Sequence, residues 1–298
     1  MHATVAMVSI ETRLNLVRQR MADALGGTVL RRLEDSGGWL AGRGKMLRAR
    51  LLLRLSLAGR IPDSIAVPAA AAVELVHAAS LLHDDVIDGG LVRRQAPAFW
   101  KTHGIPGAVL LGDLMLMKAL EVALGAADAR LVGELVRFAG ETCNAESEQE
   151  LLLRDTPWDW DACLDVDRRK TGALFAFAAG TAGGDDAPLR LALQEAGYAL
   201  GTAYQLADDL LDVAGDDRSA GKTLGRDRAR RIHTAATAFP GRPAELRDRA
   251  RALRAQAVDR LRNWPALRAA LGEYCALDFD PAVDTLLANL EPGGPEAT

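Results

Sequence analysis

The amino-acid sequence predicts an all-α fold: a single-domain bundle of about ten or more helices around a central apolar cavity. Apolar residues recur with helical periodicity along most of the chain, and no stretch shows a convincing period-2 strand pattern. Hydrophobic residues make up 49% of the 298 residues, which is enough for a large core. None of the breaks between helical segments is long or polar enough to be an interdomain linker. We therefore expect one domain over residues 1–290, followed by a disordered tail at 291–298.

Short breaks that contain glycine or proline, the residues that end helices, separate the helical segments. These breaks fall at residues 36–38, 59–62, 89–97, 155–157, 183–188, 215–225 and 240–241. The expected helices cover residues 9–26, 45–58, 64–87, 105–124, 128–153, 160–181, 187–214, 226–238, 243–263 and 281–289. In the third of them, the stretch from Val67 to Leu82 is nearly all apolar or small, so we expect that helix inside the bundle.

Composition and charge exclude several classes of protein. A formal net charge of −4 gives no support for a nucleic-acid partner or for an anionic membrane surface. We expect no membrane span, because no apolar run reaches the roughly 18 residues needed to cross a bilayer. Residues 1–10 do not resemble a signal peptide. The three cysteines are isolated and odd in number, which is typical of a reducing compartment. These observations predict a cytoplasmic protein without a membrane span.

Two aspartate-rich motifs, Asp84–Asp88 and Asp208–Asp212, lie near the C-terminal ends of two long apolar helices. Each motif has the form Asp-Asp-x-x-Asp, so its first and last carboxylates share a helix face with Cβ atoms about 5–6 Å apart. Carboxylates in apolar surroundings need compensating cations, and oxygen-only ligands suit Mg²⁺. One such motif would more often be a solvated helix cap, but a matched pair favours metal binding. The candidate ligands are Asp84, Asp85, Asp88, Asp208, Asp209 and Asp212.

Cationic residues near small residues form a second pattern. Only a few of the 36 basic residues are lysines, and Lys45, Lys170 and Lys222 each lie beside glycine or threonine, where a phosphate oxygen can approach closely. Arg48 begins a helix together with Lys45, and a helix N-terminus attracts anions. Magnesium would neutralise one diphosphate, and lysine and arginine side chains that do not contact the metal suit a second one. The candidate cations are Lys45, Arg48, Arg93, Arg94, Lys170 and Lys222.

Two further polar residues lie in register with the aspartates. His77 precedes Asp84 by seven residues, which is about two turns on nearly the same helix face, and Gln205 lies one turn before Asp208. For His77 the competing interpretation is a histidine that is merely packed in the core. For Arg93-Arg94 the competing interpretation is a pair of solvated surface charges.

With these motifs the chain resembles the trans-isoprenyl diphosphate synthases, the polyprenyl synthetase family, over about residues 42–227. Five elements occur in the order that the family has. They are residues 43–48, residues 81–88 followed by Arg93-Arg94, residues 170–175, residues 205–212, and Gly215-Asp216 with Gly221-Lys222. The resemblance implies the isoprenoid synthase type I fold and a homodimer.

The resemblance also implies a reaction. Two or three Mg²⁺ ions would help an allylic diphosphate, such as geranyl or farnesyl diphosphate, to ionise. Isopentenyl diphosphate would then attack the cation, and loss of a proton would give a linear polyprenyl diphosphate. Asp84, Asp88 and Asp208 would bind magnesium most directly, with Asp85, Asp209 and Asp212 binding or supporting it. Arg93, Lys170 and Lys222 would hold the allylic diphosphate; Lys45, Arg48, His77 and Arg94 would hold isopentenyl diphosphate; Thr171 and Gln205 would line the reacting centre.

Residues just before the first motif bear on product length. Ser80 and Ala79 lie four and five residues ahead of Asp84, and Val76 lies one turn deeper. In this family an aromatic residue there would close the tunnel at about fifteen carbons, so small residues imply a product of twenty carbons or more. Met117, on the following helix, is expected to refill part of that space.

The chain departs from the family pattern in four places, without losing a metal ligand. Residues 95–97 lack the usual glycine after the arginine pair, Arg43 replaces a glycine, Arg231-Ile232 replaces a Gly-Lys pair, and residues 274–280 lack closing basic residues. Two other functions compete. A class I terpene cyclase usually has a different second motif and needs no site for isopentenyl diphosphate. A non-catalytic subunit of a hetero-oligomeric synthase tends to lose aspartates, and this chain has lost none.

Overall fold

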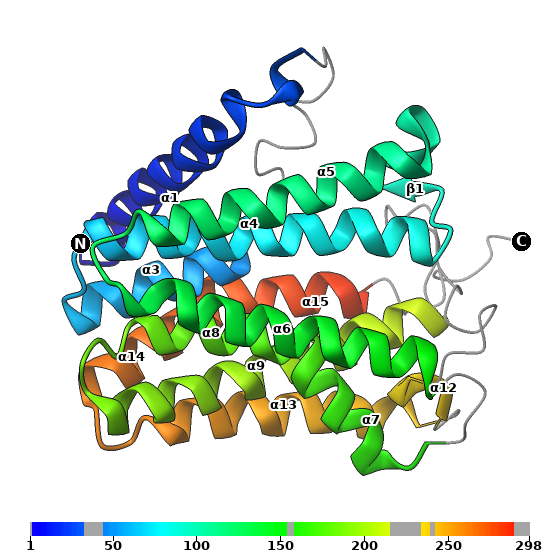
Figure 1. Ribbon diagram of the computed structural model, residues 1–298. Helices are drawn as coiled ribbons and strands as arrows, with labels where there is room; N and C mark the ends of the chain where they lie inside the picture. Colours follow the sequence, from blue (N-terminus) through cyan, green and yellow to red (C-terminus); the bar gives the residue numbers. More distant parts are fainter. Residues whose placement is uncertain (1, 33–43, 154–157, 215–233, 239–241, 289–298) are drawn as a thin grey trace, which may run out of the picture.

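The computed structural model describes residues 2–32, 44–153, 158–214, 234–238 and 242–288, and these form a bundle of helices whose long axes run in similar directions (Figure 1). The prediction of an all-α fold is confirmed. In chain order the elements are α1 His2–Gly26, the 3₁₀ helix η1 Val29–Arg32, α3 Leu47–Gly59, α4 Asp63–Ile87, β1 Val92–Arg93, β2 Ala96–Pro97, α5 Phe99–Leu124, α6 Arg130–Leu151, α7 Trp160–Asp167, the π-helix η2 Arg168–Gly172, α8 Ala173–Thr181, α9 Ala187–Ala214, α12 Ala235–Ala238, α13 Pro243–Arg260, α14 Pro265–Tyr274, the π-helix η3 Cys275–Phe279 and α15 Asp280–Ala288.

The predicted helices and the observed ones agree best where the apolar pattern is long. The predictions 64–87 and 187–214 match α4 and α9 to within one residue. Helix α14 was not predicted, because it is a short segment that begins at Pro265 and reads as a loop. The hairpin of β1 and β2 was not predicted either, since strands of two residues cannot show an alternating pattern. Most of the predicted helix 226–238 and the tail 291–298 lie outside the described residues, and the domain boundary at 290 stays a prediction.

Helix α4 is the central element of the bundle. All residues from Ala69 to Val76 are buried, so the helix is enclosed on every side over two turns. Pro68 lacks the N–H group that would bond to the Ser64 carbonyl, and the N–H of Ala127 donates to that oxygen instead, at 3.3 Å. Contrary to the expectation from the sequence, α4 is long and apolar enough to cross a membrane. In the relevant window 67% of it is buried inside the protein, so packing accounts for its apolar character.

Helix α5 runs antiparallel to α4, as the contacts between their ends show. Gly104 adopts φ 75° and interrupts the helix, which restarts at residue 105 as predicted. Further along, a Cβ atom at Gly112 would lie 2.2 Å from Nε2 of His83, so only glycine leaves room for that ring. Together with the contact between Ser64 and Ala127, this fixes which turns of the two helices face each other.

The run α7, η2 and α8 packs closely on α9. The backbones of η2 and α9 approach so closely that only glycine fits at residue 201, because a Cβ atom there would lie 2.5 Å from Cα of Gly172. A Cβ atom at Gly197 would lie 2.4 Å from the Phe175 carbonyl oxygen. The π-turn η2, which carries Lys170 and Thr171, is thereby held against the part of α9 that leads to the second aspartate motif.

Candidate active site

The first aspartate motif ends helix α4, and its middle carboxylate is the most buried. Asp85 is 2% exposed and accepts two hydrogen bonds on Oδ1 from Arg93, from Nε at 2.9 Å and from Nη2 at 2.6 Å. Its Oδ2 atom is buried and has no hydrogen-bond partner among the described residues. Asp84 and Asp88 are only partly buried. Asp85 therefore holds Arg93 in place, while Asp84 and Asp88 are more accessible.

A tight hairpin returns the two arginines to the helix end. Arg94 and Gln95 both have positive φ, 54° and 64°, a conformation that costs about 1–2 kcal/mol for residues other than glycine. The guanidinium of Arg94 lies over Gly44, where a Cβ atom would be 2.7 Å from Nη2. The chain thus forms the turn after the arginine pair without the glycine usual in the family, and the turn brings Arg94 to the start of α3.

The second aspartate motif, on α9, repeats the arrangement of the first. Asp209 is 3% exposed and accepts a hydrogen bond from Nε2 of Gln205 at 2.7 Å. The amide oxygen of Gln205 accepts a hydrogen bond from the Thr171 hydroxyl at 2.5 Å. Asp208 and Asp212 are less buried than Asp209. In both motifs the middle aspartate supports another side chain, so Asp85 and Asp209 fit the supporting role and not direct metal binding.

Helix α6 contributes Glu146 and Gln149, which contact Lys170 near the first aspartate motif. Lys170 forms an ion pair with Glu146 at 3.0 Å and donates a hydrogen bond to Gln149 at 3.0 Å. Burial and the neighbouring carboxylates of Glu146 and Asp88 raise the pKa of Asp84 to about 8, although Lys170 opposes the shift. Burial and like charge therefore both disfavour the ionised form of Asp84, a condition that a bound divalent cation would relieve.

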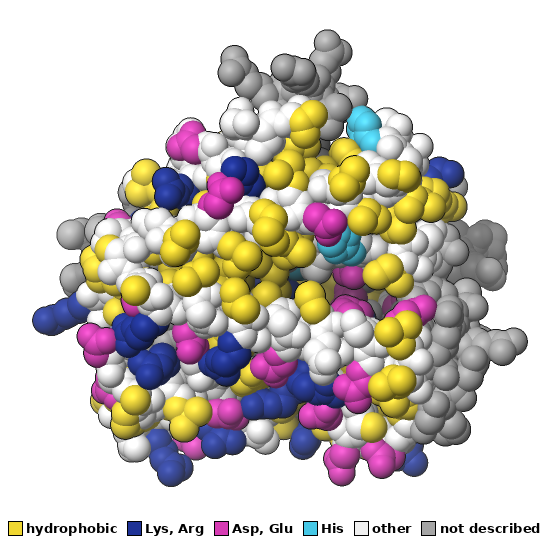
Figure 2. All heavy atoms as spheres, viewed as in Figure 1, with side chains coloured by type: hydrophobic (Ala, Val, Ile, Leu, Met, Phe, Trp, Pro, Cys, Tyr) yellow, Lys and Arg dark blue, Asp and Glu magenta, His cyan; other side chains and the backbone are white. Residues whose placement is uncertain are grey.

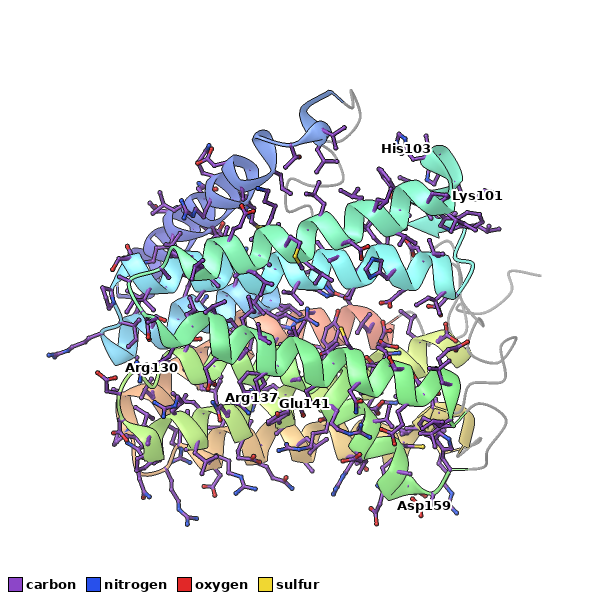
Figure 3. All side chains as sticks on the ribbon, in the orientation of Figure 1. Lys101, His103, Arg130, Arg137, Glu141 and Asp159 are labelled. Atoms are coloured by element: carbon purple, nitrogen blue, oxygen red, sulfur yellow. The ribbon has the colours of Figure 1, made fainter. Side chains whose placement is uncertain are left out.

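Gln149 could not be identified from a motif, but it belongs to a regular stripe. The buried positions of α6 follow alternating steps of four and three residues, the spacing of one helix face. Towards its other end α6 carries surface charges, seen at Arg130, Arg137 and Glu141 in Figure 3. The buried stripe consists of Leu131, Leu135, Phe138, Thr142, Ala145 and Gln149.

The two aspartate motifs face a common region. Burial lowers the pKa of Arg93, but the hydrogen bond and charge of Asp85 raise it, and the charges of Asp84 and Asp208 raise it further. The Arg93 guanidinium thus lies in the field of both motifs. Asp208 also acts on Lys45, whose pKa burial lowers. Figure 2 shows a hollow between α5 and α6, near the C-terminal ends of α4 and α6, in which acidic side chains are visible.

A second group of cations lies at the start of α3, next to the aspartate motifs. Arg48 is 8% exposed, lies 4.8 Å from the centroid of the Phe175 ring, and has a buried Nε atom without a hydrogen-bond partner among the residues described. Burial and the positive charges of Arg48, Arg94 and Arg93 hold the pKa of His77 well below its usual range. A neutral His77 donates one hydrogen bond at most.

Glu74 of α4 supports this group and was not found from the sequence. The helix-capping position of α3 is Met46, whose side chain makes no capping hydrogen bond. Oε1 of Glu74 accepts a hydrogen bond from the backbone N–H of Ala49 at 3.0 Å and so satisfies a donor at the helix start. Burial raises the pKa of Glu74, and Arg48 opposes that effect. A single acidic residue in the otherwise apolar stretch from Val67 to Leu82 is the signal that could have indicated it.

The donor set fits magnesium. Within the described ranges no three carboxylate, imidazole or thiol side chains converge closely enough to hold an ion by themselves. Mg²⁺ is usually bound by one or two carboxylates that share it with substrate phosphates and water. The burial of Asp84 beside the carboxylates of Glu146 and Asp88 fits such an ion.

The predicted product-length residues divide into two groups. Ala79 is fully buried, Val76 is 5% exposed and Ser80 is partly exposed. Met117 is 54% exposed on α5, so the prediction that it refills the interior is wrong. Met115, at 1% exposure, is the methionine of α5 that packs in the core. Lys222, Arg43 and the pair Arg231-Ile232 lie outside the residues that the structure describes.

Comparisons with known proteins identify the family of the chain. The family described as "Polyprenyl synthetase" matches residues 33–257. A geranylgeranyl diphosphate synthase of Mycobacterium tuberculosis is 37% identical over 215 residues, 66% of this chain and 61% of that protein. The chain thus spans less than two thirds of the length of this relative. A farnesyl diphosphate synthase of Geobacillus stearothermophilus is 29% identical over 92% of this chain and 98% of its own length.

A solved structure shows the same fold over almost the whole chain. The polyprenyl synthase of Caulobacter crescentus, complexed with calcium and isoprenyl diphosphate, superimposes with a TM-score of 0.68 and 25% identity, covering 97% of this chain and 91% of that one. The family match extends from before the Lys45 motif to beyond the second aspartate motif. The chain belongs to the polyprenyl synthetase family.

Proposed function

We propose that the protein is a trans-prenyltransferase that condenses isopentenyl diphosphate with an allylic diphosphate, geranyl or farnesyl diphosphate, to give a linear polyprenyl diphosphate. The observation that carries this proposal is the division of charge around one region. The two acidic motifs face it from α4 and α9 together with Arg93 of β1, while Arg48, Arg94 and the neutral His77 lie beside the start of α3. One side suits a diphosphate held through metal, and the other suits a diphosphate held by cations alone.

The residues around the acidic motifs would bind and activate the allylic substrate. Asp84, Asp88 and Asp208 would hold two or three Mg²⁺ ions, which supply Lewis acidity to the leaving diphosphate. Lys170 and Arg93 would bind the same diphosphate, and Thr171 with Gln205 would line the carbon that ionises. The apolar side chains around the site would exclude water, which would otherwise trap the cation.

The cations at α3 would place the second substrate. Arg48 and Arg94 would bind isopentenyl diphosphate, with Lys45 beside them and His77 as a neutral donor. The double bond of isopentenyl diphosphate would attack the allylic cation, and a proton would then pass from the new chain to the departing diphosphate.

The first experiment is a product assay with purified protein, Mg²⁺, isopentenyl diphosphate and allylic diphosphates of five, ten and fifteen carbons. We expect linear products that end at one length, resolved by mass. Cyclic hydrocarbon formed from the allylic substrate alone would indicate a terpene cyclase instead. No turnover with any starter would point to a non-catalytic subunit.

Product length is expected to depend on the fully buried Ala79. The proposal that the product has twenty carbons or more rests on the small residues Ala79 and Ser80 and on the buried Val76 below them. We expect Ala79→Phe to shorten the product by at least one isoprene unit, because the ring would fill the space one turn below Asp84. Mass spectrometry of the products checks this.

Two further variants make the length test specific. Ser80→Phe is the second choice if overpacking at Ala79, which costs about 1–3 kcal/mol, prevents folding. Leu191→Ala serves as the control, since its side chain is 60% exposed near the start of α9 and should leave product length unchanged. An unaltered product from both phenylalanine variants would contradict this position of the tunnel floor.

We propose a homodimer as the working form. Leu110, Met117 and Leu124 recur every seven residues on α5 and are 68%, 54% and 73% exposed. Figure 2 shows hydrophobic side chains gathered over this helix. Such a stripe suits a second copy of the same helix surface. Light scattering would give the mass in solution, and a monomeric mass at working concentration would count against the dimer.

A further inference from the structure

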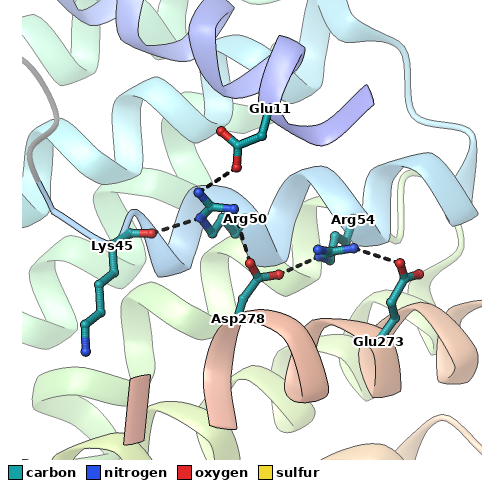
Figure 4. Close-up of polar contacts among 6 residues, drawn as sticks. All are labelled: Glu11, Lys45, Arg50, Arg54, Glu273 and Asp278. Carbon is teal, nitrogen blue, oxygen red and sulfur yellow. Dashed lines mark hydrogen bonds and ion pairs between the residues drawn. The ribbon is translucent and has the colours of Figure 1, made fainter. Parts of the chain in front are cut away.

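An ion-pair cluster ties the C-terminal part of the chain to helix α3 (Figure 4). The side chain of Asp278, on η3, is 6% exposed and accepts hydrogen bonds from Nη1 of Arg50 at 3.2 Å and from Nε of Arg54 at 2.6 Å. Glu11 pairs with Arg50 at 2.8 Å, and Glu273 pairs with Arg54 at 3.0 Å. Both arginines thus have two carboxylate partners, one of which they share.

The two arginines differ in one contact. Nε of Arg50 donates a hydrogen bond to the backbone carbonyl of Lys45 at 3.1 Å, as Figure 4 shows, whereas the contacts of Arg54 are with Asp278 and Glu273. The carbonyl that Arg50 holds belongs to the peptide before Met46, which has a left-handed φ of 49°. A residue other than glycine needs its surroundings to maintain that conformation. Arg50 is therefore placed to fix the direction in which the chain enters α3.

The C-terminal helix also contacts Lys45 through its side chain. Nζ of Lys45 donates a hydrogen bond to the carbonyl of Ala282 at 3.1 Å. Ala282 follows Asp278 by four residues, so both lie on one side of the helical run formed by η3 and α15. One face of this run thus reaches Lys45 directly at Ala282 and indirectly through Asp278 and Arg50.

We propose that Arg50, held by Asp278, is a positioning residue that sets the place of Lys45 for the diphosphate of isopentenyl diphosphate. This inference rests on the proposed function. It gives the C-terminal helix a part in substrate affinity although residues 274–280 lack the closing basic residues of the family. Arg50 acts through the Lys45 main chain and does not itself touch the substrate.

The test compares Arg50→Gln with Arg54→Gln, because each change removes ion pairs to the same cluster but only the first removes the contact to Lys45. We expect Arg50→Gln to raise the KM for isopentenyl diphosphate about tenfold, with the KM for farnesyl diphosphate unchanged within twofold. Arg54→Gln should lower the thermal midpoint yet keep both KM values. Arg54→Lys replaces it if the nearly buried site does not tolerate glutamine. Glu11→Gln should leave both KM values unaltered, since Arg50 keeps Asp278 and Lys45.

Calorimetric binding of isopentenyl diphosphate in the absence of allylic substrate separates this inference from the proposed function. Weaker binding by Arg50→Gln than by Arg54→Gln supports the positioning role even if turnover is absent in the wild type. Equal affinity of the two variants would overturn it and leave Arg50 a merely structural residue. Failure of the wild type to bind isopentenyl diphosphate at all would overturn both conclusions.

Discussion

Asparagine in place of Asp84 or Asp208 is expected to lower kcat by about 10³-fold or more. Each change keeps the shape of the side chain but removes one charge that would hold magnesium against the leaving diphosphate, and charge stabilisation of this kind is usually the largest catalytic contribution. Steady-state rates with saturating Mg²⁺ and both diphosphates measure the effect. Asp248→Asn, at a side chain that is 75% exposed on α13, is the control and should keep full activity. A variant of Asp84 that retained a tenth of the rate would contradict its assignment.

The same substitution at Asp84 should make the metal-free protein more stable. The pKa of Asp84 is about 8 in the folded protein and 3.8 as the reference value for an unfolded chain. The folded state therefore binds this proton more tightly, and the stability it contributes is lost as pH rises from about 4 to 8. Asp84→Asn should not show that loss, so its advantage in thermal midpoint grows with pH across this range. An activity loss accompanied by a stability gain separates a functional carboxylate from a structural one.

Alanine at Gly201 is expected to lower kcat about 100-fold and stability by about 1–3 kcal/mol. The added Cβ atom would lie 2.5 Å from Cα of Gly172 and 2.9 Å from the Thr171 carbonyl oxygen, so η2 would have to move away from α9. The hydrogen bond between Thr171 and Gln205 spans this interface and would lengthen. Kinetics and denaturant unfolding measure the two effects.

Gly133→Ala is the matched control for the effect of a methyl group on a helical glycine. Gly133 lies on α6 with nothing within 4 Å of an added Cβ atom. Alanine there should keep activity and stabilise the protein by about 0.4–1 kcal/mol, because glycine costs more conformational entropy on folding. If Gly201→Ala behaved like this control, the close contact of η2 and α9 would have no role in the site.

The parts of the site that the sequence could predict are those encoded in short contiguous motifs. Asp84, Asp208 and Lys170 lie in segments where residue spacing on a helix already decides which side chains share a face. The structure brings the two aspartate motifs and Lys45 into one electrostatic region. The long apolar patterns of α4 and α9 set their boundaries for a similar reason, since twenty or more residues of consistent periodicity leave little ambiguity.

What the sequence could not predict depends on contacts between distant segments. Asp85 and Asp209 look equivalent to their neighbours until the packing shows that both are buried and bonded to other side chains. Arg50 and Asp278 are separated by 228 positions, and neither belongs to a motif. Met117 was misplaced because the spacing of α5 does not reveal which of its faces meets α4.

The π-turn η2 interrupts the regular rotation of the continuous helix formed by α7 and α8. In a regular helix the inward face of α7 would dictate the inward face of α8, because each residue advances the helix by a fixed rotation of about 100°. The wider turn at Arg168–Gly172 removes that constraint. Consecutive residues of this turn bind different helices, with Lys170 bonded to α6 and Thr171 to α9. The π-turn thus links α6 and α9 at one point of the chain, while α8, which follows it, is buried in the core from Ala173 to Gly180.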